Sequence, residues 1–198
     1  NQAFPSIGEN YLITELIGRG GMGSVYKATD NKTGNTVAVK ILDKRLLDDP
    51  VALKRFMQEI ESAEKLDHPN LVPIHFHGQA PDGSPFVVMD YIPGDNLADS
   101  IAENGTFDSA VAIELFIQIV EGLESAHKAG VIHRDIKPSN VIAPKSANGV
   151  ISPRLVDFGI STVLPASGGR ETRDLTQTGE VFGSPHYMSP EQCLGFML

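Results

Sequence analysis

The pattern of apolar residues changes near residue 90, and this change limits the possible folds more than any other feature of the chain. Before it, short strand-like runs are separated by Gly-rich or polar turns. After it, apolar residues recur at the spacing of helices. The sequence therefore predicts an α+β fold, with a small, mostly β lobe at residues 1–92 and a mainly α lobe at residues 93–198.

The first lobe is expected to contain five strands and one helix. The helix begins at Pro50, because Asp49 is a good N-cap and proline suits the first helical position. A stripe at helical spacing follows, formed by Phe56, Ile60 and Ala63. The five strands are expected at residues 11–17, 24–29, 35–42, 71–76 and 85–89.

The second lobe is expected to contain one long helix, from about Asp108 to Lys128. Its apolar face is formed by residues 112, 115, 119, 123 and 126. Residues 161–183 are rich in Ser, Thr and Gly and have little periodicity. A loop of that length inside a compact domain is usually functional or mobile.

Composition excludes several classes of protein. The chain has 198 residues, a net charge of −9 and 41% apolar residues, which is typical of a soluble globular protein. The acidic balance argues against a nucleic-acid partner, and the longest stretch without a charged residue, 68–81, is too short to span a membrane. Without a secretory signal, and with Cys193 as the only cysteine, a cytoplasmic location is expected. A membrane anchor elsewhere in the parent protein is compatible with this.

Residues 18–25 form a glycine-rich pattern, Gly-Arg-Gly-Gly-Met-Gly-Ser-Val. Glycines at such spacing let backbone amides approach phosphate oxygens, although a flexible hairpin turn explains the pattern equally well on its own. A dinucleotide-binding fold would need a helix after the glycines. Residues 24–29 alternate like a strand instead, so the sequence favours a hairpin that covers phosphates.

Lys40 ends the run Val-Ala-Val-Lys, which reads as a buried strand. A buried ammonium needs a compensating charge, whereas a lysine that reaches solvent along the edge of the sheet is the simpler alternative. Glu59 lies beside the apolar stripe of the predicted helix and is the expected partner, with Glu61 and Glu64 as alternatives. A Lys40–Glu59 pair would hold the ammonium ready for an anionic ligand.

The strongest motif is His-Arg-Asp-Ile-Lys-Pro-Ser-Asn at residues 133–140, followed by Asp-Phe-Gly at residues 157–159. With the glycine-rich pattern and the run Gly-Ser-Pro-His-Tyr-Met-Ser-Pro-Glu at residues 183–191, the chain resembles the catalytic domain of protein kinases. It is most similar to the eukaryotic-like serine/threonine kinases of bacteria, and the resemblance extends over residues 11–192.

The resemblance implies a two-lobe, protein-kinase-like fold and an ATP-dependent serine/threonine protein kinase. Asp135 would accept or orient the proton of an attacking hydroxyl, and Lys137 would neutralise charge on the transferred phosphoryl group. Asn140 and Asp157 offer the oxygen ligands that Mg²⁺ prefers. The expected cofactors are ATP and Mg²⁺, and the expected catalytic residues are Asp135, Lys137, Lys40 and Glu59.

The nucleotide is expected to lie between the two lobes, with backbone hydrogen bonds to Asp90 and Ile92. Met89 would limit the depth of the adenine pocket. The full set of expected ATP-binding residues is Ile17, Gly18, Gly20, Gly23, Val25, Ala38, Lys40, Met89, Asp90, Ile92 and Ile142.

Residues 157–191 correspond to the activation segment of the family. Thr176 and Thr178 are the expected sites of autophosphorylation, and Arg134 would pair with a phosphate there. A loop that merely happens to be rich in Thr is the alternative. By resemblance, His133 and Phe158 are structural. The partners implied are proteins with Ser or Thr acceptors, and the resemblance also allows a homodimer through the small lobe.

Protein kinase domains continue past the Ser-Pro-Glu motif into further helices, whereas this sequence ends at Leu198. We therefore expect a C-terminally truncated large lobe and unfilled packing positions on the helix at residues 108–128. One alternative is a truncated, catalytically weak module that binds nucleotide and regulates. Another is a kinase-like enzyme for small molecules, which Lys137 and Pro138 argue against, because these residues serve protein substrates in the family.

Overall fold

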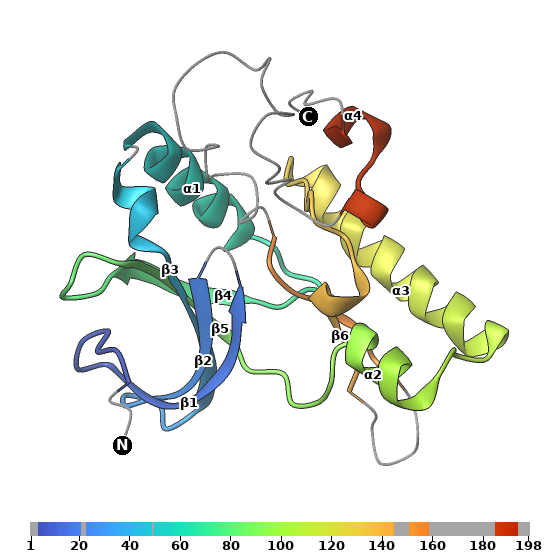
Figure 1. Ribbon diagram of the computed structural model, residues 1–198, viewed down its shortest axis with the longest axis horizontal. Coiled ribbons are helices and arrows are strands. Elements are labelled where there is room, and N and C mark those ends of the chain that lie inside the picture. Colours follow the sequence, from blue (N-terminus) through green and yellow to red (C-terminus); the bar gives the residue numbers. More distant parts are fainter. Residues whose placement is uncertain (1–3, 21–22, 49, 145–150, 159–184, 194–198) are drawn as a thin grey trace.

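The computed structural model describes residues 4–20, 23–48, 50–144, 151–158 and 185–193. Figure 1 shows a twisted β-sheet with helix α1 beside it, and helices α2 and α3 on the other side of the molecule. Short segments around β6 lie between these two regions. The predicted α+β architecture, with strands in the first part and helices in the second, is confirmed.

The sheet is antiparallel throughout, with the strand order β1-β2-β3-β5-β4. All five predicted strands form, although β4 begins three residues later than expected. The apolar residues 71–73 look like a strand, but Val72 donates its N–H to the backbone oxygen of Leu155 instead of pairing within the sheet. The bounds are β1 Tyr11–Gly20, β2 Gly23–Asp30, β3 Thr36–Leu42, β4 Ile74–Gln79 and β5 Pro85–Asp90.

The glycine-rich residues join β1 to β2 as a hairpin, with Gly18 opposite Val25 and Gly20 opposite Gly23. Gly23 has a φ of +147°, and a Cβ atom there would lie 2.1 Å from the backbone oxygen of Ile41. Only glycine fits at this position. A strand follows the glycines, so the hairpin is confirmed and the dinucleotide-binding alternative is excluded.

Helix α1, Pro50–Ala63, follows the short 3₁₀ helix η1, Lys44–Asp48, and covers one face of the sheet. Phe56 and Ile60 are buried against a cluster that includes Leu42 and Val87. Burial of side chains of this size contributes about 1.5–3 kcal/mol each. This packing holds the helix against the sheet, and Glu59 stands between the two anchoring residues.

Helix α3, Ser109–Lys128, is the long helix predicted from the sequence, and Asp108 caps it by accepting the N–H of Ala110 at 2.9 Å. Its buried face includes Leu115 and Ile119. Among the described residues, its other face exposes large apolar side chains. These are Ile113, Phe116, Ile117 and Val120.

The remaining elements are short. Within the described part of the chain, no helix combines the length and the apolarity needed to cross a bilayer. The bounds are α2 Leu97–Asn104, η2 Pro138–Asn140, β6 Val141–Ile142, β7 Arg154–Leu155, η4 Pro185–Tyr187 and α4 Pro190–Cys193.

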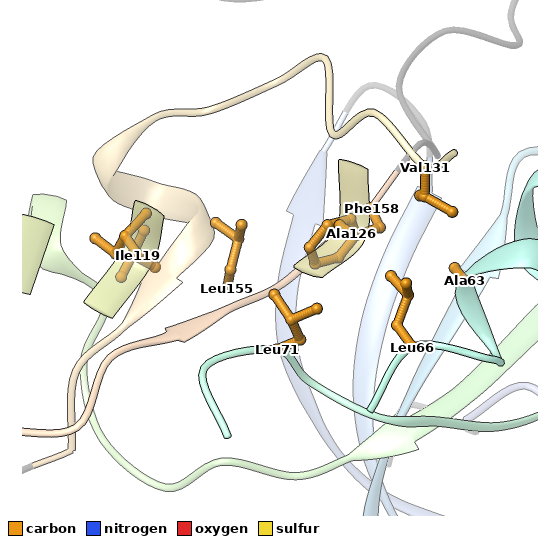
Figure 2. Packing of buried hydrophobic residues seen from close by; sticks show 9 residues of the cluster. Ala63, Leu66, Leu71, Ile119, Ala126, Val131, Leu155 and Phe158 are labelled. Carbon is orange, nitrogen blue, oxygen red and sulfur yellow. The ribbon is translucent and has the colours of Figure 1, made fainter. Parts of the chain in front are cut away.

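A core cluster connects α1 and the segment after it with α3 and the β6–β7 pair (Figure 2). Figure 2 shows the side chains of Leu71 and Leu155 next to each other within this cluster. Both are almost completely buried. The cluster thereby fixes the strand that leads to Asp157 against the first part of the molecule. Its buried members are Ala63, Leu66, Leu71, Ile119, Ala126, Val131, Val141, Leu155 and Phe158.

Candidate active site

Lys40 lies in the middle of the sheet, on β3, with Val25 and Val87 as its cross-strand neighbours. Only 7% of the residue is exposed, and its Nζ lies 2.9 Å from Oδ1 of Asp157. A carboxylate from the second part of the molecule therefore compensates the buried ammonium. Two predicted site residues that are 117 positions apart in the chain, 157 minus 40, meet directly.

Asp157 and Arg134 have positive φ angles, of 66° and 63°, and among the described residues they are the only non-glycine residues that do. This left-handed conformation is uncommon for residues with side chains and is concentrated at functional sites. Asp157 comes two residues after β7, and Arg134 precedes Asp135 directly. The two strained positions thus mark the two loops that carry the predicted chemistry.

Asp135 accepts hydrogen bonds within its own loop. Nζ of Lys137 lies 2.7 Å from its Oδ2, and Nδ2 of Asn140 donates to its Oδ2 at 3.0 Å and to its backbone oxygen at 2.8 Å. Because the amide hydrogens of the buried Asn140 are directed to Asp135, its Oδ1 is the atom that can serve as a metal ligand. The structure brings these three predicted residues together.

His133 connects the loop of Asp135 to the strand of Asp157. Its Nε2–H donates to the backbone oxygen of Val156 at 2.8 Å, and its Nδ1 accepts the N–H of Asp135. Its ring also contacts Phe158, with 4.7 Å between the ring centroids. Burial lowers the pKa of His133, although the Val156 hydrogen bond and the nearby Asp157 and Asp135 act in the opposite direction.

This depressed pKa predicts a pH-dependent stability. On unfolding, His133 returns to its ordinary pKa of about 6.5, so below that pH the unfolded chain binds more protons than the folded one. The contribution of His133 to the free energy of unfolding is therefore fully present above about pH 6.5. It decreases as the pH falls, by at most about 1.4 kcal/mol per pH unit. Urea unfolding at several pH values measures this slope.

We expect His133→Gln to flatten the pH dependence, because glutamine does not titrate. His127→Gln makes the same chemical change at an exposed position of α3 and is the matched control. A slope that persists in His133→Gln would assign the pH dependence to other groups.

The predicted Lys40–Glu59 pair is wrong for this structure. Oε1 of Glu59 pairs with Nη1 of Arg134 instead, at a short distance, while Lys40 pairs with Asp157. The reason is charge compensation: Asp157 already neutralises Lys40, and the guanidinium of Arg134 faces α1. Of the alternative partners, Glu64 pairs with His77 at 2.6 Å.

The Glu59 carboxylate is only half satisfied in this arrangement. Its Oε2 is buried and is the only such side-chain atom in the described residues without a hydrogen-bond partner. Unpartnered buried carboxylate oxygens are unfavourable, because they lose their hydration without compensation. A cavity of about 220 Å³ adjoins this pair, lined by Glu59, Arg134 and residues 130–132, among others.

The predicted adenine-pocket residues lie mainly on one face of the sheet. Val25 and Val87 flank Lys40, and Met89 is paired with Ala38, so these side chains point the same way. Val25, Ala38, Met89 and Ile92 belong to one packed cluster, which Val156 also joins. Asp90 ends β5, and Ile142 lies on β6, opposite Arg154.

Three predicted residues, Ile17, Gly18 and Gly20, lie on the hairpin at the end of β1. Ile17 is about half exposed. Thr176 and Thr178, the expected phosphorylation sites, lie outside the described residues.

Sequence reasoning missed two contacts with the site. Gln192 on α4 donates from Nε2 to the backbone oxygen of Arg134 at 2.6 Å. Asn70 donates from Nδ2 to the backbone oxygen of Pro153 at 2.9 Å, close to the strand before Asp157. Neither residue lies in a motif with a recognisable spacing, so only the folded chain identifies them.

Comparisons with known proteins agree with this geometry. The sequence model of the protein kinase domain matches residues 11–195. The chain is 35% identical over 193 residues to serine/threonine-protein kinase pkn3 of Myxococcus xanthus, covering 98% of this chain and 35% of that protein. It is 38% identical over 189 residues to serine/threonine-protein kinase PrkC of Bacillus subtilis, covering 96% and 28%. The chain thus spans about a third, or less, of these curated relatives.

Solved structures give the same result. A crystal structure of a double mutant of the PknI kinase domain of Mycobacterium tuberculosis superposes with a TM-score of 0.73 at 26% identity, covering 99% of this chain and 71% of that one. A second PknI kinase domain structure gives a TM-score of 0.68 at 29% identity, covering 81% and 64%. The expected two-lobe fold is thereby confirmed.

Proposed function

The chain belongs to the protein kinase domain family and is related to bacterial serine/threonine protein kinases, and we propose that it transfers the γ-phosphoryl group of ATP to Ser or Thr hydroxyls of proteins. One connected set of contacts carries this proposal. Lys40 from the sheet and Asp157 from the second part meet at 2.9 Å, and His133 links the strand of Asp157 to the loop of Asp135.

The proposed nucleotide would lie against the face of the sheet that carries Ala38 and Lys40, with Met89 limiting the depth of the adenine pocket and Lys40 directed to the phosphates. Asn140 and Asp157 would hold Mg²⁺, and their oxygen atoms fit this ion. The described residues contain no group of three or more His, Cys, Asp or Glu side chains that would form a cage. Two protein ligands suit Mg²⁺, which takes the rest from phosphates and water. When bound, the ion offsets negative charge on the phosphates.

In the proposed reaction, the acceptor hydroxyl oxygen forms a bond to the γ-phosphorus of ATP. The bond between that phosphorus and the β,γ-bridging oxygen breaks, and its electron pair leaves with ADP. Asp135 takes or orients the hydroxyl proton. Lys137, 2.7 Å from the Asp135 carboxylate, offsets the charge that develops on the transferred group.

The ion pairs of this structure need to exchange partners before transfer. Asp157 is paired with Lys40 here, yet the proposed reaction requires it for the metal. Once Asp157 turns to the metal, the phosphates would compensate the charge of Lys40, and Glu59 on α1 is the carboxylate proposed to hold the ammonium in place. A phosphate on Thr176 or Thr178 would compete with Glu59 for Arg134 and release it. Regulation by autophosphorylation is therefore part of the proposal.

The Glu59–Arg134 ion pair favours a second candidate function. With Glu59 bound to Arg134, the chain has the ion pairs of a resting state, which would suit a nucleotide-binding regulatory module with weak catalysis. Measured transfer decides between the two functions.

The test uses the natural protein that carries this chain, with radiolabelled ATP, Mg²⁺ and matched peptides that differ only in a Ser, Thr or Tyr acceptor. We expect label on Ser and Thr, and mass spectrometry should find phosphate on Thr176 or Thr178. Nucleotide binding without any transfer would favour the regulatory module. Label confined to Tyr would contradict the proposed acceptor class.

A further inference from the structure

Asn70 is a buried polar residue in the connection between α1 and β4. Only 5% of it is exposed. Its Nδ2 donates to the backbone oxygen of Pro153 at 2.9 Å and to Oε1 of Gln118, on α3, at 3.3 Å. Gln118 in turn donates from Nε2 to the backbone oxygen of Ile151 at 3.5 Å. The side chain thus joins three segments: the connection to β4, helix α3 and the residues just before β7.

The backbone around Asn70 holds the same strand. The N–H of Leu155 donates to the backbone oxygen of Asn70 at 2.8 Å, and the N–H of Val72 donates to the backbone oxygen of Leu155 at 3.1 Å. Leu71 and Leu155 form a parallel bridge between these bonds. Residues 70–72 therefore act as an extra strand beside β7, and the Asn70 side chain extends the contact to Pro153.

The other edge of β7 is attached to the loop that carries Asn140. Val141 pairs with Leu155, and the N–H of Val156 donates to the backbone oxygen of Asn140 at 3.0 Å. Strand β7 is thus held on both edges, and Asp157 follows it after a single intervening residue. The relative position of Asn140 and Asp157 depends on where β7 lies.

We propose that Asn70 is a positioning residue for the metal-binding pair Asn140 and Asp157. It does not touch nucleotide or metal, and it acts by fixing β7, with Gln118 in support. Loss of its amide leaves the backbone oxygen of Pro153 without its buried donor, which loosens the strand from which Asp157 projects. Direct hydrogen-bond partners of metal ligands typically change metal affinity about 10- to 100-fold when they are replaced; Asn70 acts one step further away, through β7, so an effect at the lower end is expected. The inference rests on the proposed function, because it assumes that Asn140 and Asp157 bind Mg²⁺.

The measurement is the ratio of two dissociation constants for ATP, without and with Mg²⁺, determined by calorimetry on the natural protein. A substitution that merely unfolds a fraction of the molecules lowers the active fraction equally in both titrations. It therefore leaves the ratio of the two dissociation constants unchanged. We expect Asn70→Ala to reduce the ratio about tenfold. Asp108→Ala, which removes the cap of α3 away from β7, is the stability control and should keep the normal ratio.

Gln118→Met is the milder second variant, because Gln118 is only partly buried, and it carries the test if Asn70→Ala does not fold. It should lower the ratio in the same direction by a smaller factor. A normal ratio in a folded Asn70→Ala protein, or in Gln118→Met where the former does not fold, would overturn the positioning role. If the unaltered protein shows no Mg²⁺-dependent gain in ATP affinity, the proposed function itself fails.

Discussion

Asp135→Asn should lower phosphoryl transfer about 10²- to 10⁴-fold, the contribution typical of a positioned acid–base group, while ATP binding is retained. Asparagine has nearly the same shape as aspartate and keeps an oxygen that can accept from Lys137 and Asn140, which contact Asp135 in this structure. It cannot accept a proton. The loss of phosphoryl transfer in this variant therefore reports on the proton-accepting role of Asp135 and not on a changed geometry of its loop. Transfer of radiolabel from ATP to a Ser peptide gives the rate, and calorimetry gives the affinity for ATP.

The matched control is Asp67→Asn, which makes the same chemical change at an exposed position outside the site. It should leave both transfer and ATP affinity unaltered. Transfer by Asp135→Asn at the rate of the unaltered protein would remove Asp135 from the mechanism. A parallel loss of ATP affinity would instead show that the substitution disrupts the site as a whole.

The parts of the site that lie close together in the chain could be predicted from the sequence. Asp135 and Asn140 are separated by five positions, and the motif alone placed both in one site; the structure adds that their side chains contact each other. A shared site for Lys40 and Asp157 was also predicted, because the ammonium would bind the phosphates directly and the carboxylate would bind them through Mg²⁺. The structure adds that the two groups touch.

The choice of ion-pair partners could not be predicted. Lys40 and Arg134 are two cations, Glu59 and Asp157 are two carboxylates, and both ways of pairing them neutralise all four charges. The pairing that forms depends on small displacements of α1 relative to the second part, and Coulomb energies at such distances depend strongly on position. A sequence pattern contains no information at that scale, so the expected Lys40–Glu59 pair was wrong for this structure.

The late start of β4 has a similar cause. Residues 71–73 have the apolar pattern of a strand, and they do pair with a strand, but that strand is β7 and not a member of the sheet. Local pattern predicts an extended conformation correctly, whereas the identity of the hydrogen-bond partner is a property of the tertiary fold. Asn70 shows the same limit, because its bonds reach residues more than 40 positions away in the chain.

Lys40→Met should lower phosphoryl transfer about 10²- to 10³-fold, the loss that follows removal of one preorganised charge-stabilising donor. Methionine fills the space of the lysine stem in the sheet without its ammonium. In the reacting state proposed above, Glu59 acts through Lys40. Adding Glu59→Gln to Lys40→Met should therefore lower the rate very little further, although Glu59→Gln alone lowers it in the unaltered background.

Stability without nucleotide should give a different pattern, because the structure describes no partner shared by Lys40 and Glu59. Lys40→Met and Glu59→Gln should be coupled more weakly in the free energy of unfolding than Lys40→Met and Asp157→Asn, which should be coupled by about 0.5–3 kcal/mol. Urea unfolding of the single and double variants measures both cycles. Strong coupling of Lys40 with Glu59 in stability would mean that these two residues are already paired before nucleotide binds. Coupling seen in turnover alone would mean that Lys40 exchanges Asp157 for Glu59 during the reaction, as proposed above.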